Sequence, residues 1–141
     1  MANKNESKRV PKSAVFSIGV DKADSGSNIL GFIEGDIAIT SVKLVVTEAF
    51  DGTTPTITVT DTQGGTTETH FTAVPLGVEI VDTSVAIAPS GLGTATPLYR
   101  STKGQWDCEL VSGGSTAGEV CIVVDYTQLD TEPGLHSLED N

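Results

Sequence analysis

Apolar and polar residues alternate with a two-residue period along much of this chain, and this period constrains the fold more than any other feature of the sequence. In the segments 14–20, 106–110 and 120–126, every second residue is apolar. Such alternation predicts β-strands with one buried face, because successive side chains of a strand point to opposite faces of the sheet. No segment has a helical period of useful length. The pattern therefore predicts an all-β fold.

Clusters of Gly, Pro, Asp and Ser separate the alternating segments, as in "DKADSGSN", "DGTTP", "TQGGTTE" and "SGLGTATP". These residues favour turns, and together the turns divide the chain into about eight strands at near-regular spacing. The abundance of Thr, Val and Ile also favours strands. A length of 141 residues suits one domain. We expect an antiparallel β-sandwich of the jelly-roll type, with a barrel as the alternative.

The phase of the alternation identifies the expected core and one irregularity. Ile37 and Ile39 share one phase, whereas Val42 and Leu44 share the other, so we expect a bulge or a bend at Thr40 and Ser41. The side chains expected to be buried are Phe16, Ile18, Leu44, Val46, Ile57, Val59, Trp106, Leu110, Ile122 and Val124.

The stretch "SGGSTAGE" precedes the most apolar segment of the chain and could be a phosphate-binding loop or a turn. A phosphate loop needs a helix after its glycines, but β-branched residues follow here. We therefore expect a hairpin loop in which Val111 pairs with Glu119. This pairing places Cys108 and Cys121 on opposite faces of the hairpin, so we expect two free thiols and no disulfide.

No arrangement of residues typical of an enzyme occurs in the chain, and we expect neither catalysis nor a cofactor. Asp51, Asp61 and Glu68 stand on or beside turns and could bind calcium, but their spacing matches no known calcium loop. We expect them to be solvated loop carboxylates. Trp106 is in phase with core residues, so we expect it to be buried and not to stack on a sugar. The remaining candidate is an exposed interface pair formed by Tyr99 and Arg100.

Basic residues are concentrated at the start of the chain. Four of the eight Lys and Arg residues are Lys4, Lys8, Arg9 and Lys12, although the net charge of the whole chain is −11. We expect residues 1–13 to form an extended basic arm that binds a partner through these four side chains. Such an arm could contact an acidic protein surface or a nucleic acid, or it could simply be solvated.

The rest of the chain is strongly acidic and should repel nucleic acid, so we expect no nucleic-acid partner. We expect a β-sandwich body at 14–128 and an acidic tail at 129–141. Leu129, Leu135 and Leu138 are the apolar residues with which the tail could bind a partner. No apolar run approaches the roughly 18 residues needed to span a membrane. The first lysines have no apolar segment behind them, so we expect no signal peptide and synthesis in a cytosol.

Two segments together resemble small virion proteins of tailed bacteriophages. These are "ITSVKLVVTEAFDGTTPTITVTD" and "VSGGSTAGEVCIVVDYTQ", and the resemblance covers residues 29–62 and 111–127. The family pattern has a glycine before Asp61, where this chain has Thr60. The shared motifs are structural and contain no catalytic residue. The arm and the tail lie outside the resemblance.

The resemblance implies a β-sandwich that decorates or cements a bacteriophage capsid, often as a homotrimer. Its implied partners are the major capsid protein or other virion proteins. The implied location is the capsid surface of the virion, after synthesis in the host cytoplasm. A component of the tail, the baseplate or a head fibre is the first alternative. A carbohydrate-binding, adhesin-type β-sandwich is the second, although the aromatic content of 5% is low for a sugar-stacking site.

Overall fold

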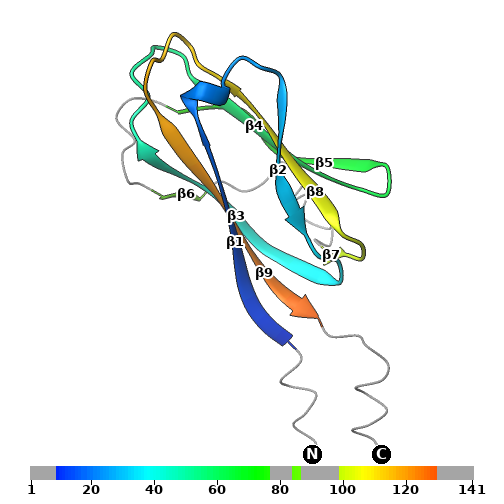
Figure 1. Ribbon diagram of the computed structural model, residues 1–141. Coiled ribbons are helices and arrows are strands. Elements are labelled where there is room, and N and C mark those ends of the chain that lie inside the picture. Colours follow the sequence, from blue (N-terminus) through cyan, green and yellow to red (C-terminus); the bar gives the residue numbers. More distant parts are fainter. Residues whose placement is uncertain (1–8, 77–83, 87–98, 130–141) are drawn as a thin grey trace, which may run out of the picture.

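The computed structural model describes residues 9–76, 84–86 and 99–129 (Figure 1). This part of the chain is built of β-strands and contains a single 3-10 helix, η3 (Val20–Lys22). The strands are β1 (Arg9–Gly19), β2 (Ser27–Ile33), β3 (Ile37–Glu48), β4 (Thr56–Gln63), β5 (Thr66–Pro75), β6 (Ser84–Ala86), β7 (Tyr99–Arg100), β8 (Gly104–Val111) and β9 (Glu119–Leu129). Within these residues no helix is long or apolar enough to cross a membrane.

The strands form two antiparallel sheets. Sheet A has the order β1-β9-β3-β6, with β7 also paired to β3, and sheet B has the order β2-β8-β4-β5. The pairing is nested, because β1 pairs with β9, β2 with β8, β3 with β6, and β4 with β5. Nested pairing across two sheets is the arrangement of a jelly roll. The predicted all-β sandwich is therefore confirmed.

The core lies between the two sheets and consists of the side chains that the two-residue period selects. Nine of the ten residues expected in the core are buried, and the tenth, Phe16, is half-buried against the others. The ring of Phe16 stacks on that of Trp106 at 6.4 Å between centroids, and Trp106 itself is 1% exposed. Trp106 is therefore a core residue, as the alternation indicates.

The predicted irregularity in β3 is also confirmed. The register between β3 and β9 shifts between Ile39 and Ser41, so Thr40 is the extra residue of a bulge. The bulge lets Ile39 and Val42 both face the core although three positions separate them.

The expected hairpin between β8 and β9 is wrong. Strand β8 belongs to sheet B and β9 belongs to sheet A, so the loop 112–118 crosses from one sheet to the other. Alternation determines which face of a strand is buried, but it does not determine the neighbouring strand. Both cysteines are nevertheless free thiols, as expected. Cys108 is buried between the sheets, and Cys121 is half-buried on the outer face of sheet A.

The first strand begins earlier than the expected boundary between arm and body. Strand β1 starts at Arg9, so residues 9–13 of the expected arm are paired with β9. The alternation does not reveal that this segment is a strand, because Pro11 and Lys12 interrupt it. An edge strand tolerates both residues. Arg9 pairs with Leu129, so the start of β1 and the end of β9 lie together at one end of the sandwich (Figure 1).

Candidate functional site

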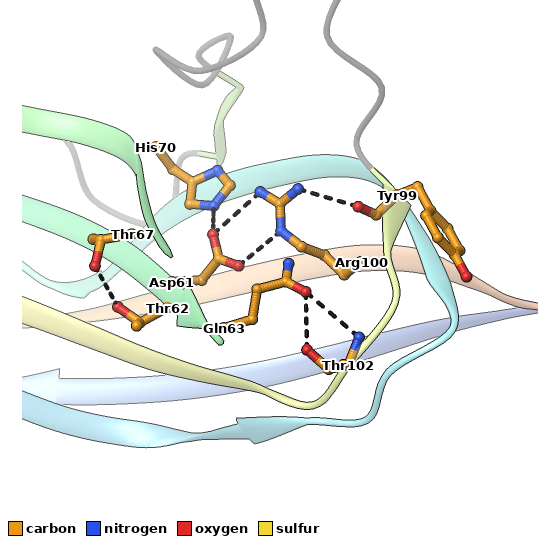
Figure 2. Close-up of polar contacts among 8 residues, drawn as sticks. All are labelled: Asp61, Thr62, Gln63, Thr67, His70, Tyr99, Arg100 and Thr102. Atoms are coloured by element: carbon orange, nitrogen blue, oxygen red, sulfur yellow. Dashed lines mark hydrogen bonds and ion pairs between the residues drawn. The ribbon is translucent and has the colours of Figure 1, made fainter. Parts of the chain in front are cut away.

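The most concentrated polar chemistry in the described part of the chain is a buried cluster of Asp61, His70 and Arg100 (Figure 2). Arg100 Nε donates to Oδ2 of Asp61 at 2.9 Å, and Arg100 Nη2 donates to Oδ1 at 3.3 Å. His70 Nε2 lies 2.6 Å from the same Oδ1, and the imidazole stacks on Trp106 at 4.8 Å between centroids. Since a carboxylate only accepts hydrogen bonds, Nε2 carries the proton.

The cluster joins the two sheets. Asp61 is on β4 and His70 is on β5, both in sheet B, whereas Arg100 is on β7 in sheet A. Burial by itself raises the pKa of Asp61. The hydrogen bonds from His70 and Arg100 and the positive charge of Arg100 outweigh this effect and hold the pKa below its ordinary value of 3.8. Asp61 is therefore an ionised carboxylate that ties β7 to sheet B.

An open cleft of about 530 Å³ lies beside the cluster. On its lining, Gln63 Oε1 accepts hydrogen bonds from the backbone N–H and the hydroxyl of Thr102, at 3.4 and 3.1 Å (Figure 2). The hydroxyl of Tyr99 donates to Asp36 at 3.0 Å, which raises the pKa of Tyr99. Gln63 thus joins the end of β4 to the loop after β7. Tyr99 joins the start of β7 to the turn before β3.

Two sequence expectations fail at this cluster. Asp61 is not a solvated loop carboxylate, because Arg100 and His70 enclose it at 1% exposure. Tyr99 is about half exposed, as expected of an interface residue, but Arg100 is buried because its charge is matched by Asp61. Glu68 lies half-buried on β5 and not in a loop. The described residues contain no group of three acidic, His or Cys side chains that could hold a metal ion.

One signal in the sequence could have located the cluster. Asp61 continues the inward phase of Ile57 and Val59, so the alternation itself places a carboxylate in the core. A buried carboxylate requires a cation or several donors. The partners, His70 and Arg100, lie on other strands, and a single sequence does not reveal such distant pairings.

At one end of the sandwich, Asp51 binds the loop between β8 and β9. Asp51 Oδ1 accepts hydrogen bonds from the backbone N–H groups of Thr116 and Ala117, at 2.7 and 3.2 Å, and Oδ2 accepts one from the Thr116 hydroxyl at 2.8 Å. These bonds, the one from the Thr116 hydroxyl first, lower the pKa of Asp51. They also join the segments "FDGTTP" and "SGGSTAGE" into one folded unit.

Three further contacts complete this loop end (Figure 1, top). Asp24 accepts hydrogen bonds from the N–H and the hydroxyl of Ser112, at 3.0 and 2.6 Å. Gly52 N–H donates to the hydroxyl of Ser115 at 2.8 Å. Gly118 has a φ of +146° and lies so close to Phe50 that a Cβ would be 2.3 Å from its ring. The loop end is therefore a packed structure held by carboxylates from two other loops.

The opposite end carries three of the residues that the sequence assigns to partner binding. Arg9 opens β1, Lys12 is exposed on β1 opposite Tyr126, and Leu129 closes β9. The other four, Lys4, Lys8, Leu135 and Leu138, lie outside the described residues. The structure brings the base of the arm and the base of the tail together, since β1 and β9 are paired there.

Next to this end, Asp125 organises the outer face of sheet A. Its carboxylate accepts hydrogen bonds from Ser13 at 2.6 Å and Ser41 at 2.8 Å, and Lys43 Nζ lies 3.1 Å away. These contacts, led by the bond from Ser13, lower the pKa of Asp125. A shallow groove of about 310 Å³ runs past Asp125 and Lys12. The base of the arm is thus fixed to the body.

Comparison with known proteins shows similarity in fold. No protein-family model and no curated protein matches the sequence. A chain in the structure of the cyanophage Pam1 capsid asymmetric unit matches this fold with a TM-score of 0.60 at 16% identity, and the match covers 86% of both chains. A chain in the capsid of Ralstonia phage GP4 matches with a TM-score of 0.52 at 16% identity, again over 86% of both chains. The two-sheet antiparallel sandwich is therefore a fold that this chain shares with chains of phage capsids.

Proposed function

We propose that this chain is a structural protein of a bacteriophage virion, and that it decorates and cements the capsid surface. The observation that carries the proposal is the similarity in fold to chains of two phage capsids over 86% of the chain. The resemblance of the "VTEAFDGTTPTITV" and "GGSTAGE" segments to small phage virion proteins points in the same direction. The function is structural, with no catalytic step.

The two ends of the sandwich support a directional attachment. The loop end is closed by its own hydrogen bonds to Asp51 and Asp24. At the other end, the chain enters at Arg9 and leaves at Leu129, next to each other. We assign the second end to the shell, with the major capsid protein as partner. The contact residues in this assignment are Lys4, Lys8, Arg9, Lys12, Leu129, Leu135 and Leu138.

Repetition on a capsid explains how modest contacts can suffice. A single exposed ion pair is worth only about 0–1 kcal/mol, and salt weakens it. Copies joined in a closed ring bind the shell at several points at once, which multiplies the affinity. We therefore include a homotrimer in the proposal, so that each trimer bridges several capsid subunits.

The test is binding of the purified full chain to heads of the source phage from which this protein has been removed. We expect the chain to sediment with the heads, and cryo-electron microscopy to place it at repeated positions of the lattice. The variant Lys8→Glu should bind more weakly than Lys22→Glu, the matched control at the loop end, and the difference should shrink at high salt. A chain found only at the tail or at one vertex would overturn the proposal.

A further inference from the structure

Exposed apolar side chains are concentrated on two neighbouring strands of the molecule. Two of the strands, β1 and β2, carry four of the six large apolar side chains that are exposed in the described part of the chain. On β1 these are Val10 at 41% and Val15 at 61%, and on β2 they are Ile29 at 64% and Phe32 at 55%. Such a concentration marks an interaction surface more often than single apolar residues do.

These two strands are edge strands, and they lie beside each other. Among the described residues, β1 pairs only with β9, and β2 pairs only with β8. Phe16 of β1 packs onto Gly31 of β2, where a Cβ would meet the ring at 2.7 Å. One side of the sandwich therefore presents the free edges of both sheets. Free edges offer unpaired backbone groups to another strand.

The two strands themselves contain no acidic residue. Every other strand longer than three residues contains at least one Asp or Glu, whereas β1 and β2 contain none. In a chain of net charge −11, two copies that approach each other meet the least repulsion here. Pro11 and Lys12 protect the beginning of β1 from edge pairing, but the segment 13–19 has neither a proline nor a charge.

We propose that this side is the surface through which copies of the chain associate, with β1 of one copy lying against β2 of the next. The two strands complement each other. Lys12 adds a positive charge to β1, and Asp107 lies opposite Ile29 on the strand beside β2. Because β1 and β2 differ, the contact is heterologous, and such contacts form a closed ring when the rotation from one copy to the next closes. The proposal deepens the homotrimer of the proposed function and rests on it for the size of the ring.

The first test measures the oligomeric state of the full chain by light scattering. We expect a closed oligomer whose dissociation constant rises by about tenfold or more in Val15→Glu and in Ile29→Glu. The matched control is Val111→Glu, which adds the same charge at an exposed apolar residue of β8, and its dissociation constant should stay close to that of the parent. All three side chains are exposed, and thermal unfolding confirms that each variant folds. A monomeric parent chain, or equal weakening in all three variants, would overturn the proposal.

The second test identifies the pairing. In a Cys121→Ser background, Val15→Cys and Ile29→Cys are prepared as separate proteins, mixed and oxidised. A disulfide between the two different variants supports the contact of β1 with β2, whereas disulfides only between like copies refute it. Binding to phage heads is measured on the same samples. Rings that form through this side but do not bind heads would refute the proposed function and leave the self-association standing. A monomer that binds heads would refute the self-association and leave the proposed function standing.

Discussion

Asp51 holds Thr116 with both carboxylate oxygens: Oδ1 accepts the backbone N–H at 2.7 Å, and Oδ2 accepts the hydroxyl at 2.8 Å. The two residues are 65 positions apart, so this contact joins a turn near the middle of the chain to the loop before the last strand. A loop rich in small residues loses much conformational entropy on folding. The bidentate contact offsets part of that cost at one point.

Replacing Asp51 with Ala should loosen the loop end and leave the sheets intact. The backbone N–H groups of Thr116 and Ala117 lose their acceptor, so their hydrogen exchange should accelerate, and the melting temperature should fall. Hydrogen exchange measured residue by residue checks the prediction. The exposed carboxylate of Asp21 provides the control, since Asp21→Ala should leave both amides protected. Unchanged exchange at Thr116 in Asp51→Ala would contradict the assignment.

Gly118 and Gly114 allow steric contact to be separated from backbone strain. Both have positive φ, but a Cβ at Gly118 would lie 2.3 Å from the ring of buried Phe50, whereas nothing lies within 4 Å of one at Gly114. We expect Gly114→Ala to cost about 1 kcal/mol of strain. Gly118→Ala should cost about 1–3 kcal/mol more, because the core must shift. Chemical denaturation of both variants gives the comparison, and equal costs would exclude the Phe50 contact.

Removing the carboxylate of the buried cluster should be one of the most damaging single changes in the body. Asp61→Ala leaves Arg100 buried without its counter-ion, and we expect a loss of about 3–5 kcal/mol in the free energy of unfolding. The double variant Asp61→Leu/Arg100→Met removes both charges and should be more stable than Asp61→Ala alone. The exposed Glu109→Ala should change stability by less than about 0.5 kcal/mol. Urea unfolding of the three proteins decides the matter, and a double variant less stable than Asp61→Ala would argue against a charge effect.

The same carboxylate should contribute to stability in a pH-dependent manner. Its pKa is lower in the folded protein than the ordinary value of 3.8, so its contribution is fully present above pH 3.8 and is lost as the pH falls toward the folded-state pKa. The difference in unfolding free energy between the parent and Asp61→Asn should therefore be constant near neutral pH and shrink in acid. A series of urea titrations at decreasing pH measures it. Asp24, Asp51 and Asp125 also have lowered pKa values, and taking the difference cancels their contributions.

The two thiols should differ in reactivity. Burial raises the pKa of Cys108 to about 12, so the thiol stays protonated and inert in the folded protein. Cys121 is half-buried on the outer face of sheet A; its pKa is also raised, first of all by burial, and it should react slowly. Titration with a thiol reagent should find Cys121 alone in the native protein and both thiols after denaturation. The variant Cys121→Ser should show no native reaction, and fast labelling of Cys108 would contradict its burial.

The sequence predicts the faces of the strands better than their neighbours. Alternation identifies the core residues, and the phase change at Thr40 identifies a bulge, because both follow from the local geometry of one strand. The pairing of Val111 with Glu119 fails, because a seven-residue loop can either turn back within a sheet or cross between sheets. The choice depends on packing between distant segments.

The buried cluster shows the same limit. The inward phase of Asp61 is visible in the sequence, but Arg100 lies 39 positions away on a two-residue strand that has no period to detect. The start of β1 is also not predicted, because Pro11 and Lys12 interrupt the apolar alternation there. An edge strand needs less apolar alternation than a central one, so its ends look like a loop.

The position of β9 between β1 and β3 has a consequence for the order in which the protein folds. A ribosome makes β1 and β3 long before β9, yet neither can pair with it until the chain has been made to Leu129. Strand β8 has the same place between β2 and β4 in the other sheet. Pairs such as β4 with β5 can form earlier, but both sheets are completed only after β8 and β9 emerge, so the body completes its folding late and slowly, through contacts between distant residues. Until that moment β1 and β2 remain without their partner strands and open to chaperones.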